Sequence, residues 1–279
     1  MKFWISVALL GFFGWSPLAA TADTGHTREQ ATATIRQHHL QRLYNRVHQD
    51  PGELRRACRY ESEIATAPPA GQVVLSFDDG PEPGQTERIL EVLKKHGIQA
   101  TFFLIGEKAQ AHPQLVNRIL EGDGHTVANH SWSHPNFHDI SVSQQTREVL
   151  SYEEAPSAGP VHLLFRYPYG NSSCETNALL HERGYRIVGW HVDSCDWAFD
   201  KTGQVSSSEA LACGVLAQNR SNFVEHVLSS VRAHKGGIVL LHEIHPNTLA
   251  QLDELIERLK AEGFAFGSIE DEAFAASLR

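Results

Sequence analysis

The sequence has few positive charges for its length. Its 279 residues include 24 lysines and arginines against 33 aspartates and glutamates, which gives a net charge of -9 and a pI near 6.0. A nucleic-acid-binding protein normally has a basic face, so this balance argues against that class. No apolar run after the N-terminus is long enough to span a bilayer. The 41% of apolar residues is enough for one large domain with a substantial core or for two small domains, and we expect one domain.

Cysteine is also scarce. The sequence has four cysteines and no Cys-x-x-Cys pair, which makes a cysteine metal site a weak hypothesis. In an exported chain, four cysteines can form two disulfides in any of three connectivities. We predict that Cys195 pairs with Cys213, tying down the loop between them, and that Cys58 pairs with Cys174.

The N-terminus is typical of an exported protein. Residues 1–22 combine Met1-Lys2, an apolar stretch from Phe3 to Trp15 and the small residues Ala20-Thr21-Ala22, which indicates a secretory signal peptide. No cysteine follows the apolar stretch, so nothing in it indicates a lipid anchor. We therefore expect a periplasmic or extracellular protein with no transmembrane segment in the mature chain.

Two further regions follow the signal peptide. Residues 23–70 are predicted to form a helical extension and a linker, because apolar residues recur at helical spacing up to about Cys58 and Pro68-Pro69-Ala70-Gly71 comes next. Residues 71–279 alternate short strand-like and helix-like runs, which predicts an α/β fold with a parallel sheet. The expected strands include residues 100–104, 186–192 and 237–242. Seven repeats suit a closed or nearly closed barrel. An open doubly wound sheet is the alternative, although no glycine-rich phosphate loop follows any strand.

Polar residues follow the ends of the expected strands. Asp78 and Asp79 come after the run from Gln72 to Phe77, and by themselves they are typical of a solvated turn before Gly80-Pro81. Other strand ends carry comparable groups, and in a parallel barrel these ends share one face, so the side chains should converge. The other candidates are His130, His134, Arg166, Asp193, Asp196 and His242.

A metal site is the first hypothesis for these residues. His130 and His134 are four residues apart, so on a helical turn they would face the same side and could hold zinc. With 17 histidines, about one such pair is expected by chance. Asp79 would complete a set of three protein ligands that leaves one position open for water, as catalytic zinc requires.

The remaining candidates each have a structural and a catalytic interpretation. Arg166 is either an exposed residue in a turn or the partner that keeps Asp78 ionised. His242 ends an apolar strand and is either a buried structural histidine or a general acid. Asp193 and Asp196 lie in a polar loop, and either of them could accept the ring N–H of a catalytic histidine.

Trp197 follows that loop directly. It either completes the core or lines a sugar-binding site.

Five motifs in this order resemble those of the polysaccharide deacetylase family, also called carbohydrate esterase family 4 or the NodB-homology domain. The resemblance extends from about Gln72 to Gly267. One departure is Ser76, where the family commonly has threonine. The motifs are Ser-Phe-Asp-Asp-Gly, His-Ser-Trp-Ser-His, Arg-Tyr-Pro-Tyr, Asp-Ser-Cys-Asp-Trp and Leu-Leu-His.

The resemblance implies a distorted (β/α)7-type barrel that uses a divalent metal, usually zinc. It implies that Asp78 is the general base and His242 the general acid, and that Arg166 tunes Asp78. It leaves open whether Asp193 or Asp196 supports His242. The metal ligands that it implies are Asp79, His130 and His134, and the substrate-binding groups are the Tyr169 amide and Leu240.

The activity that we expect is hydrolysis of N-acetyl groups from N-acetylglucosamine units of a peptidoglycan-like or chitin-like glycan. Alternatives are an acetylxylan-type O-deacetylase, a catalytically silent glycan-binding protein and an unrelated metal-dependent amidase. Residues 198–221 read as an insertion beside the cleft, and we expect them to set the preference for one glycan.

Overall fold

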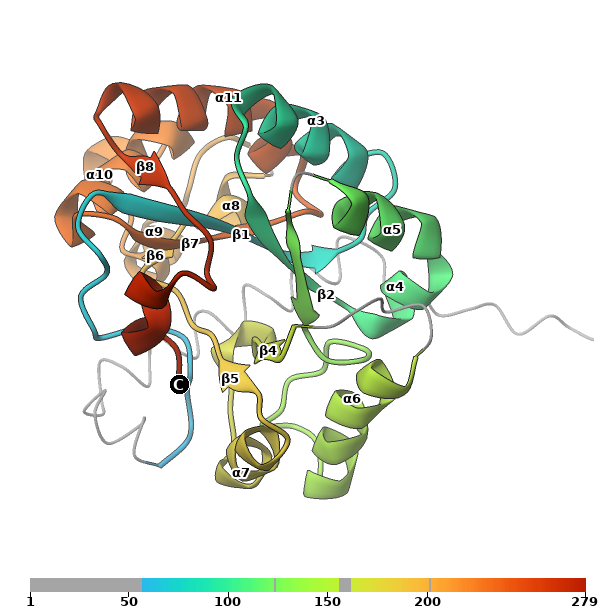
Figure 1. Ribbon diagram of the computed structural model, residues 1–279. Helices are drawn as coiled ribbons and strands as arrows, with labels where there is room; N and C mark the ends of the chain where they lie inside the picture. The colour runs from blue at the N-terminus through green and yellow to red at the C-terminus, as the bar shows by residue number, and fades with distance from the viewer. Residues whose placement is uncertain (1–56, 123, 156–161, 201) are drawn as a thin grey trace, which may run out of the picture.

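The computed structural model describes residues 57–122, 124–155, 162–200 and 202–279 (Figure 1). The expected signal peptide lies outside the described residues, as do residues 27–56 of the helix expected from Thr27 to about Cys58. Among the described residues, no helix has the length and apolar character needed to cross a membrane.

One parallel sheet of eight strands organises the domain. Seven strands follow the order β5-β4-β3-β2-β1-β7-β6, and β8 pairs with the start of β1. Neighbouring strands in the sheet are parallel throughout, as the alternation of strands and helices predicts. The strands are β1 Gln72–Gly80, β2 Ala100–Leu104, β3 Thr126–Asn129, β4 Leu164–Phe165, β5 Arg186–Ile187, β6 Val192–Asp193, β7 Gly237–His242 and β8 Ala265–Phe266.

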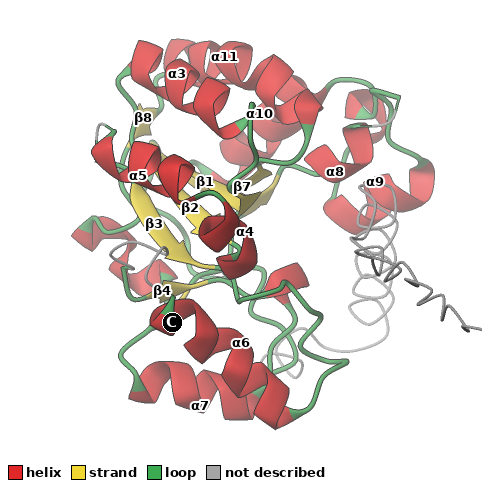
Figure 2. Ribbon diagram, turned by 90° about the vertical axis from the view of Figure 1, so that its right-hand side faces the viewer, coloured by secondary structure: helices red, strands yellow, loops and turns green. Residues whose placement is uncertain are grey.

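Helices connect the strands and cover the sheet. Figure 2 shows the strands between α3, α10 and α11 on one side and α6 and α7 on the other. The α-helices are α3 Thr86–His96, α4 Gly106–Ala111, α5 Pro113–Glu121, α6 Val142–Glu154, α7 Cys174–Glu182, α8 Asp196–Phe199, α9 Ser207–Cys213, α10 Phe223–His234 and α11 Pro246–Ala261. The 3₁₀ helices are η1 Pro168–Gly170, η2 Ala217–Asn219 and η3 Glu272–Ser277.

The two faces of β1 belong to different parts of the core. Val73, Leu75 and Phe77 pack with the outer helices, whereas Val74 packs with Phe103 on the inner face. All five side chains are fully buried, and burying each apolar side chain of this size stabilises the fold by about 1.5–3 kcal/mol. The inner face carries polar groups towards the carboxyl end of the strand, so the apolar core and the site are parts of one barrel interior.

The architecture confirms the predicted distorted (β/α)7-type barrel, and the barrel is open between β5 and β6. The single strand expected over residues 186–192 is two short strands, separated by residues 188–191. The gap is filled by residues that precede β1, since Glu63 forms a bridge with Trp190.

Both predicted disulfides are confirmed. Cys58 is bonded to Cys174 and Cys195 to Cys213. The second disulfide joins the residue before α8 to the last residue of α9, so it ties down the expected insertion, which contains α9 and η2. No element was expected inside that insertion. The described part of the segment before β1, residues 57–70, forms no helix.

Candidate active site

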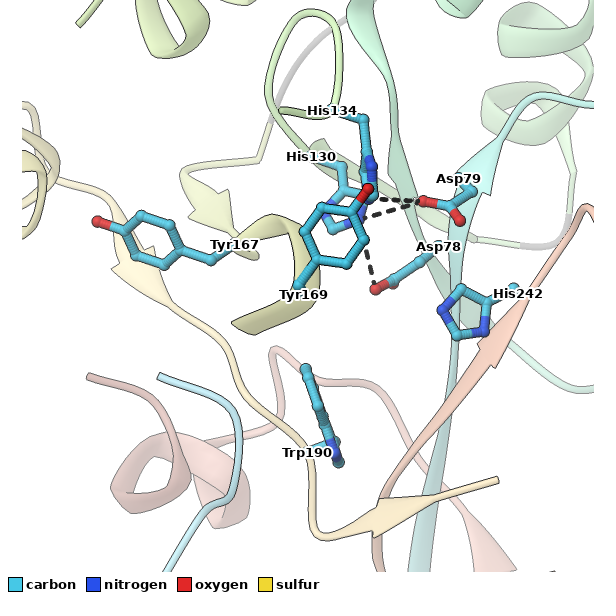
Figure 3. A pocket seen from close by; sticks show the side chains of 8 residues that line it. All are labelled: Asp78, Asp79, His130, His134, Tyr167, Tyr169, Trp190 and His242. Atoms are coloured by element: carbon cyan, nitrogen blue, oxygen red, sulfur yellow. Dashed lines mark ion pairs between the residues drawn. The ribbon is translucent and has the colours of Figure 1, made fainter. Parts of the chain in front are cut away.

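The carboxyl ends of β1 and β7 and the loops that follow β3 and β4 surround one pocket (Figure 3). All but two of its lining residues are among the residues expected from the sequence. The exceptions are Tyr167 and Trp190. The lining residues are Asp78, Asp79, His130, His134, Tyr167, Tyr169, Trp190 and His242.

A bulge at the end of β1 brings two consecutive aspartates into the pocket. Side chains next to each other on a regular strand point to opposite faces. Here Asp79 has a left-handed backbone, with φ of 70°, and the pairing register with β2 shifts between Asp78 and Gly80. Bulges of this kind re-aim side chains next to active sites. The Nζ of Lys108 donates to the Asp79 carbonyl at 2.8 Å.

The two histidines lie on a loop after β3. The prediction that they occupy a helical turn is wrong, because Ser131 and His134 have φ of 69° and 58° and the segment is not helical. Local hydrogen bonds hold the loop instead. The Ser131 amide donates to Asn129 Oδ1 at 2.8 Å, and the His134 amide donates to Ser131 Oγ at 3.0 Å.

Three possible metal-ligand atoms converge in the pocket. The Asp79 Oδ1 lies 3.1 Å from Nε2 of His134 and 3.4 Å from Nε2 of His130. The Oδ1 atom is buried and accepts no hydrogen bond from the described residues. His130 Nδ1 donates to the Arg166 carbonyl at 2.8 Å, which leaves the Nε2 lone pair facing Asp79. These observations fit a divalent metal held by one carboxylate and two imidazoles.

The charge of Asp79 suits that role. Burial by itself would raise its pKa, but His134 and His130 outweigh burial and hold the pKa well below the usual range. The side chain is therefore an anion at neutral pH.

Asp78 is held by a buried arginine. Nη1 of Arg166 donates to Asp78 Oδ1 at 2.7 Å and to Ser76 Oγ at 2.9 Å, and Nη2 donates to the Gly189 carbonyl at 3.0 Å. The guanidinium is fully buried and lies 4.1 Å from the centre of the Phe103 ring. Burial lowers the pKa of Arg166, and Asp78 opposes that shift. The second oxygen of Asp78, Oδ2, lies 3.6 Å from Nε2 of His130. It therefore faces the ligand cluster, which is the group of Asp79, His130 and His134.

His242 is supported by Asp196, which answers the question that the sequence left open. His242 Nδ1 donates to Asp196 Oδ1 at 2.7 Å, and the His242 amide donates to Oδ2 at 2.7 Å. Thr248 also donates to Oδ2, at 2.6 Å, and no feature of the sequence indicated this contact. Burial by itself would lower the pKa of His242, but Asp196 outweighs it and the pKa rises to about 10. The negative charge of Asp196 therefore favours the protonated form of the ring.

Two predicted site residues lie elsewhere. Trp197 is fully buried in the hydrophobic core, so the prediction that it lines a sugar-binding site is wrong and its alternative, completion of the core, is correct. Asp193 was a candidate to support His242, but Asp196 has that place. Oδ1 of Asp193 accepts the Cys195 amide at 2.9 Å in the turn before α8.

The remaining predicted groups lie at or near the pocket. Tyr169 lines it with a left-handed backbone, φ of 58°, and its ring lies 4.8 Å from that of His134. Leu240 is buried on β7, on the same strand face as His242. The Tyr167 side chain points away from the ligand cluster and donates to Asn177 at 2.7 Å (Figure 3).

Known proteins are similar to this chain in sequence and in fold. A profile of the polysaccharide deacetylase family matches residues 65–188. The peptidoglycan-N-acetylglucosamine deacetylase PgdA of Listeria monocytogenes is 33% identical over 219 residues, which are 78% of this chain and 42% of that protein. The chain thus spans about two fifths of the length of that relative.

Two other similar proteins match over nearly their whole length. The chitooligosaccharide deacetylase of Sinorhizobium fredii is 33% identical over 228 residues, covering 74% of this chain and 95% of that protein. The structure of a family 4 carbohydrate esterase from Streptomyces lividans in complex with acetate is similar with a TM-score of 0.58 and 30% identity, covering 72% of this chain and 93% of that one.

Proposed function

Because this chain belongs to the polysaccharide deacetylase family, we propose that it removes N-acetyl groups from N-acetylglucosamine units of a peptidoglycan-like or chitin-like glycan and releases acetate. The observation that carries the proposal is the arrangement around Asp78. One of its oxygens is fixed by Arg166, and the other faces the Asp79–His130–His134 cluster. The names of the PgdA and chitooligosaccharide deacetylase relatives support an acetamide rather than an acetyl ester as the substrate.

Asp79, His130 and His134 are the residues that would hold the metal. Zinc suits them best, since catalytic zinc takes three protein ligands of the nitrogen and carboxylate type and keeps an open position. When bound, the ion would supply Lewis-acid polarisation of the acetyl carbonyl and would lower the pKa of water.

Asp78 is the general base of the proposed reaction. Its Oδ2 accepts the proton of the attacking water, while the bond from Arg166 to Oδ1 fixes the orientation of the carboxylate. The same arginine accepts the His130 ring N–H through its carbonyl, so one buried residue orients both the base and a metal ligand.

The Tyr169 amide is the protein donor that we propose for the developing oxyanion. The next two amides, of Gly170 and Asn171, are already bonded to the carbonyls of Tyr167 and Pro168. A preorganised backbone donor at such a position contributes on the order of 10²–10³ in rate. Leu240 precedes His242 by two residues on β7, so both side chains lie on the same face of the strand. Leu240 is the apolar group that we propose for contact with the acetyl methyl group.

His242 is the general acid. An amine is a poor leaving group until it is protonated, and the Nε2 of His242 is the ring atom that Asp196 leaves unbonded. Donation from Nε2 to the sugar nitrogen completes cleavage of the C–N bond, and Asp196 stabilises the imidazolium beforehand.

We further propose that the protein acts outside the cytoplasm. The N-terminal residues have the pattern of a signal peptide, and two disulfides are typical of oxidising compartments. Peptidoglycan is accessible to a protein at such a location.

Acetate release tests the reaction, the metal and the glycan together. Peptidoglycan, chitin oligomers and acetylxylan would each be incubated with the protein, before and after treatment with a chelator. We expect acetate from peptidoglycan or chitin oligomers, loss of release with chelator and recovery when zinc is added. Release from acetylxylan alone would favour the O-deacetylase, and no release from any glycan would refute the proposal.

A further inference from the structure

A short segment before β1 lies between two walls of the pocket. We call residues 58–64 the strap. On one side it pairs with the residues that separate β5 from β6, since the Trp190 amide donates to the Ser62 carbonyl at 2.8 Å and the Ile64 amide donates to the Trp190 carbonyl at 3.0 Å. Trp190 itself lines the pocket.

On its other side the strap pairs with the loop that carries Tyr169. The Glu61 amide donates to the Gly170 carbonyl at 2.9 Å, and Tyr60 forms an antiparallel bridge with Asn171. The Ser172 amide donates to the carbonyl of Arg59 at 3.0 Å. The strap therefore joins the Tyr169 loop to the Trp190 segment, although the chain connects them only by way of α7 and β5.

The strap and the Tyr169 loop are packed closely at Gly170. A Cβ atom on Gly170 would lie 2.5 Å from Cβ of Ser62, which is closer than non-bonded carbon atoms approach one another. Tyr169 and Gly170 both have left-handed backbones, with φ of 58° and 69°. For Tyr169 this conformation is unfavourable, so it persists only where the surrounding structure holds it.

The strap is anchored at its start and at its middle. The Cys58–Cys174 disulfide fastens the start of the strap to the first residue of α7. The buried Glu61 carboxylate accepts from Asn177 at 3.0 Å and forms an ion pair with Arg279. Asn177 in turn accepts the hydroxyl of Tyr167, so a chain of hydrogen bonds leads from the strap to the start of the Tyr169 loop.

We infer that the strap is a positioning element for the active site, which holds the Tyr169 loop in the conformation that presents its backbone to the reacting carbonyl. The inference rests on the proposed deacetylase function. It predicts a division of effects, because the metal ligands come from β1 and from residues 130–134 of the loop after β3. The strap contacts that loop further along the chain, where His138 Nε2 donates to the Arg59 carbonyl at 2.8 Å. Loosening the strap should lower kcat and leave metal affinity unchanged.

Gly170→Ala tests the inference directly, because its methyl group would collide with Ser62. Gly184→Ala is the matched control: its φ of 81° imposes similar backbone strain, but the nearest atom to the new Cβ is Leu163 Cδ1, at 3.5 Å. We expect kcat on peptidoglycan or chitin oligomers to fall at least ~10-fold in Gly170→Ala, given the size of oxyanion-donor effects. In Gly184→Ala it should change less than ~2-fold, and zinc affinity should be unchanged in both.

A second substitution distinguishes the strap from a local effect on the loop. Ser62→Gly removes the closest atom that the new methyl group would meet, while Ser62 Cα and Trp190 Cη2 stay at 3.2 Å, so it should restore part of kcat when combined with Gly170→Ala. Failure of this rescue, or an unchanged kcat in Gly170→Ala, would overturn the inference.

Glu61→Gln provides a test that does not depend on the glycine variants. It keeps the side-chain volume and removes the ion pair with Arg279. We expect a fall in kcat of about 3-fold, the order of one weakened polar contact, with KM and zinc affinity unchanged. A kcat equal to that of the unaltered protein would contradict the inference. If the unaltered protein released no acetate, the proposed function itself would fail, which is a separate outcome.

Discussion

The two sides of the pocket are built in different ways. On the ligand side, local turns aim Asp79 and His134, which both have left-handed backbones. On the proton-transfer side, geometry depends on side chains that are far apart in the sequence. Arg166 contacts Asp78 across 88 positions, and His242 contacts Asp196 across 46.

The difference shows where each side is vulnerable. A turn can be predicted from a short motif and depends mainly on its own residues, although the His130 ring also donates to the distant Arg166 carbonyl. A buried charge pair depends on its partner, and removal of one member leaves an uncompensated charge, which typically costs about 3–5 kcal/mol. On the ligand side, substitution of the ligands themselves should therefore abolish function. On the proton-transfer side, substitution of the residues that hold the base and the acid should reduce function as well.

The largest effect is expected from Asp79→Ala on the ligand side. The substitution removes the only carboxylate of the ligand cluster, so both bound metal and acetate release should be lost. Elemental analysis of the purified protein and an acetate assay measure the two losses. Glu262→Ala, which removes a surface ion pair with Arg232, is the control and should keep both properties. A metal-loaded Asp79→Ala protein would contradict the assignment.

On the proton-transfer side, substitutions should lower the rate of catalysis without loss of the bound metal. Asp78→Asn preserves the shape of the base but cannot accept the proton, and His242→Ala removes the acid. Each should lower kcat on the order of 10²- to 10⁴-fold, while the zinc content stays equal to that of the unaltered protein. The same two measurements apply. If either variant lost its zinc, the assignment of that residue to proton transfer and not to metal binding would be wrong.

A smaller and more specific effect is expected from Asp196→Asn. The proposed mechanism requires protonated His242, so activity should fall as pH rises through the pKa of that group. Burial tends to lower this pKa, whereas Asp196, together with smaller contributions from Asp79 and Asp78, raises it to about 10. Without the Asp196 charge, the alkaline limb of the kcat profile should move to lower pH by at least ~1 pH unit. Thr248→Val, which removes only one donor to Asp196, should shift the limb less. An unmoved limb in Asp196→Asn would show that His242 is not the acid.

The sequence predicted the parts of the fold in which local pattern and burial agree. β2 and β7 have the predicted bounds because each is an apolar run that is buried throughout. The strand expected over residues 186–192 is interrupted for a long-range reason. The carbonyls of Val188 and Gly189 accept hydrogen bonds from Arg166. No periodicity within residues 186–192 could reveal that partner.

The site divides in the same way. The ligand residues were predicted from motifs, although the helical turn expected for His130 and His134 is a loop held by Ser131. The choice between Asp193 and Asp196 could not be made from sequence, since both follow the same strand and only the contact with His242 distinguishes them. Trp197 was ambiguous for a similar reason, because an aromatic residue after a strand can point into the core or the cleft.

The smallest predicted effect concerns Ser76, the position at which the family commonly has threonine. Its hydroxyl accepts from Arg166 at 2.9 Å and donates to the Val239 carbonyl at 2.8 Å, entirely within the barrel. Ser76→Ala leaves a buried donor and a buried acceptor each without one partner, which should cost about 1–3 kcal/mol of stability. For a domain of this size the melting temperature should fall by roughly 2–12 °C.

Catalysis should suffer less than stability in this variant, because Asp78 and Gly189 still hold the guanidinium. We expect kcat to fall about 2- to 5-fold, on the scale of one support lost among several. Ser76→Thr keeps the hydroxyl and is the matched control, with a melting temperature and kcat closer to those of the unaltered protein. If Ser76→Ala equalled the unaltered protein in both measurements, the hydrogen bond from Arg166 to Ser76 would contribute nothing to stability or to kcat. The proton-transfer side would then depend on fewer of its distant contacts than the geometry indicates.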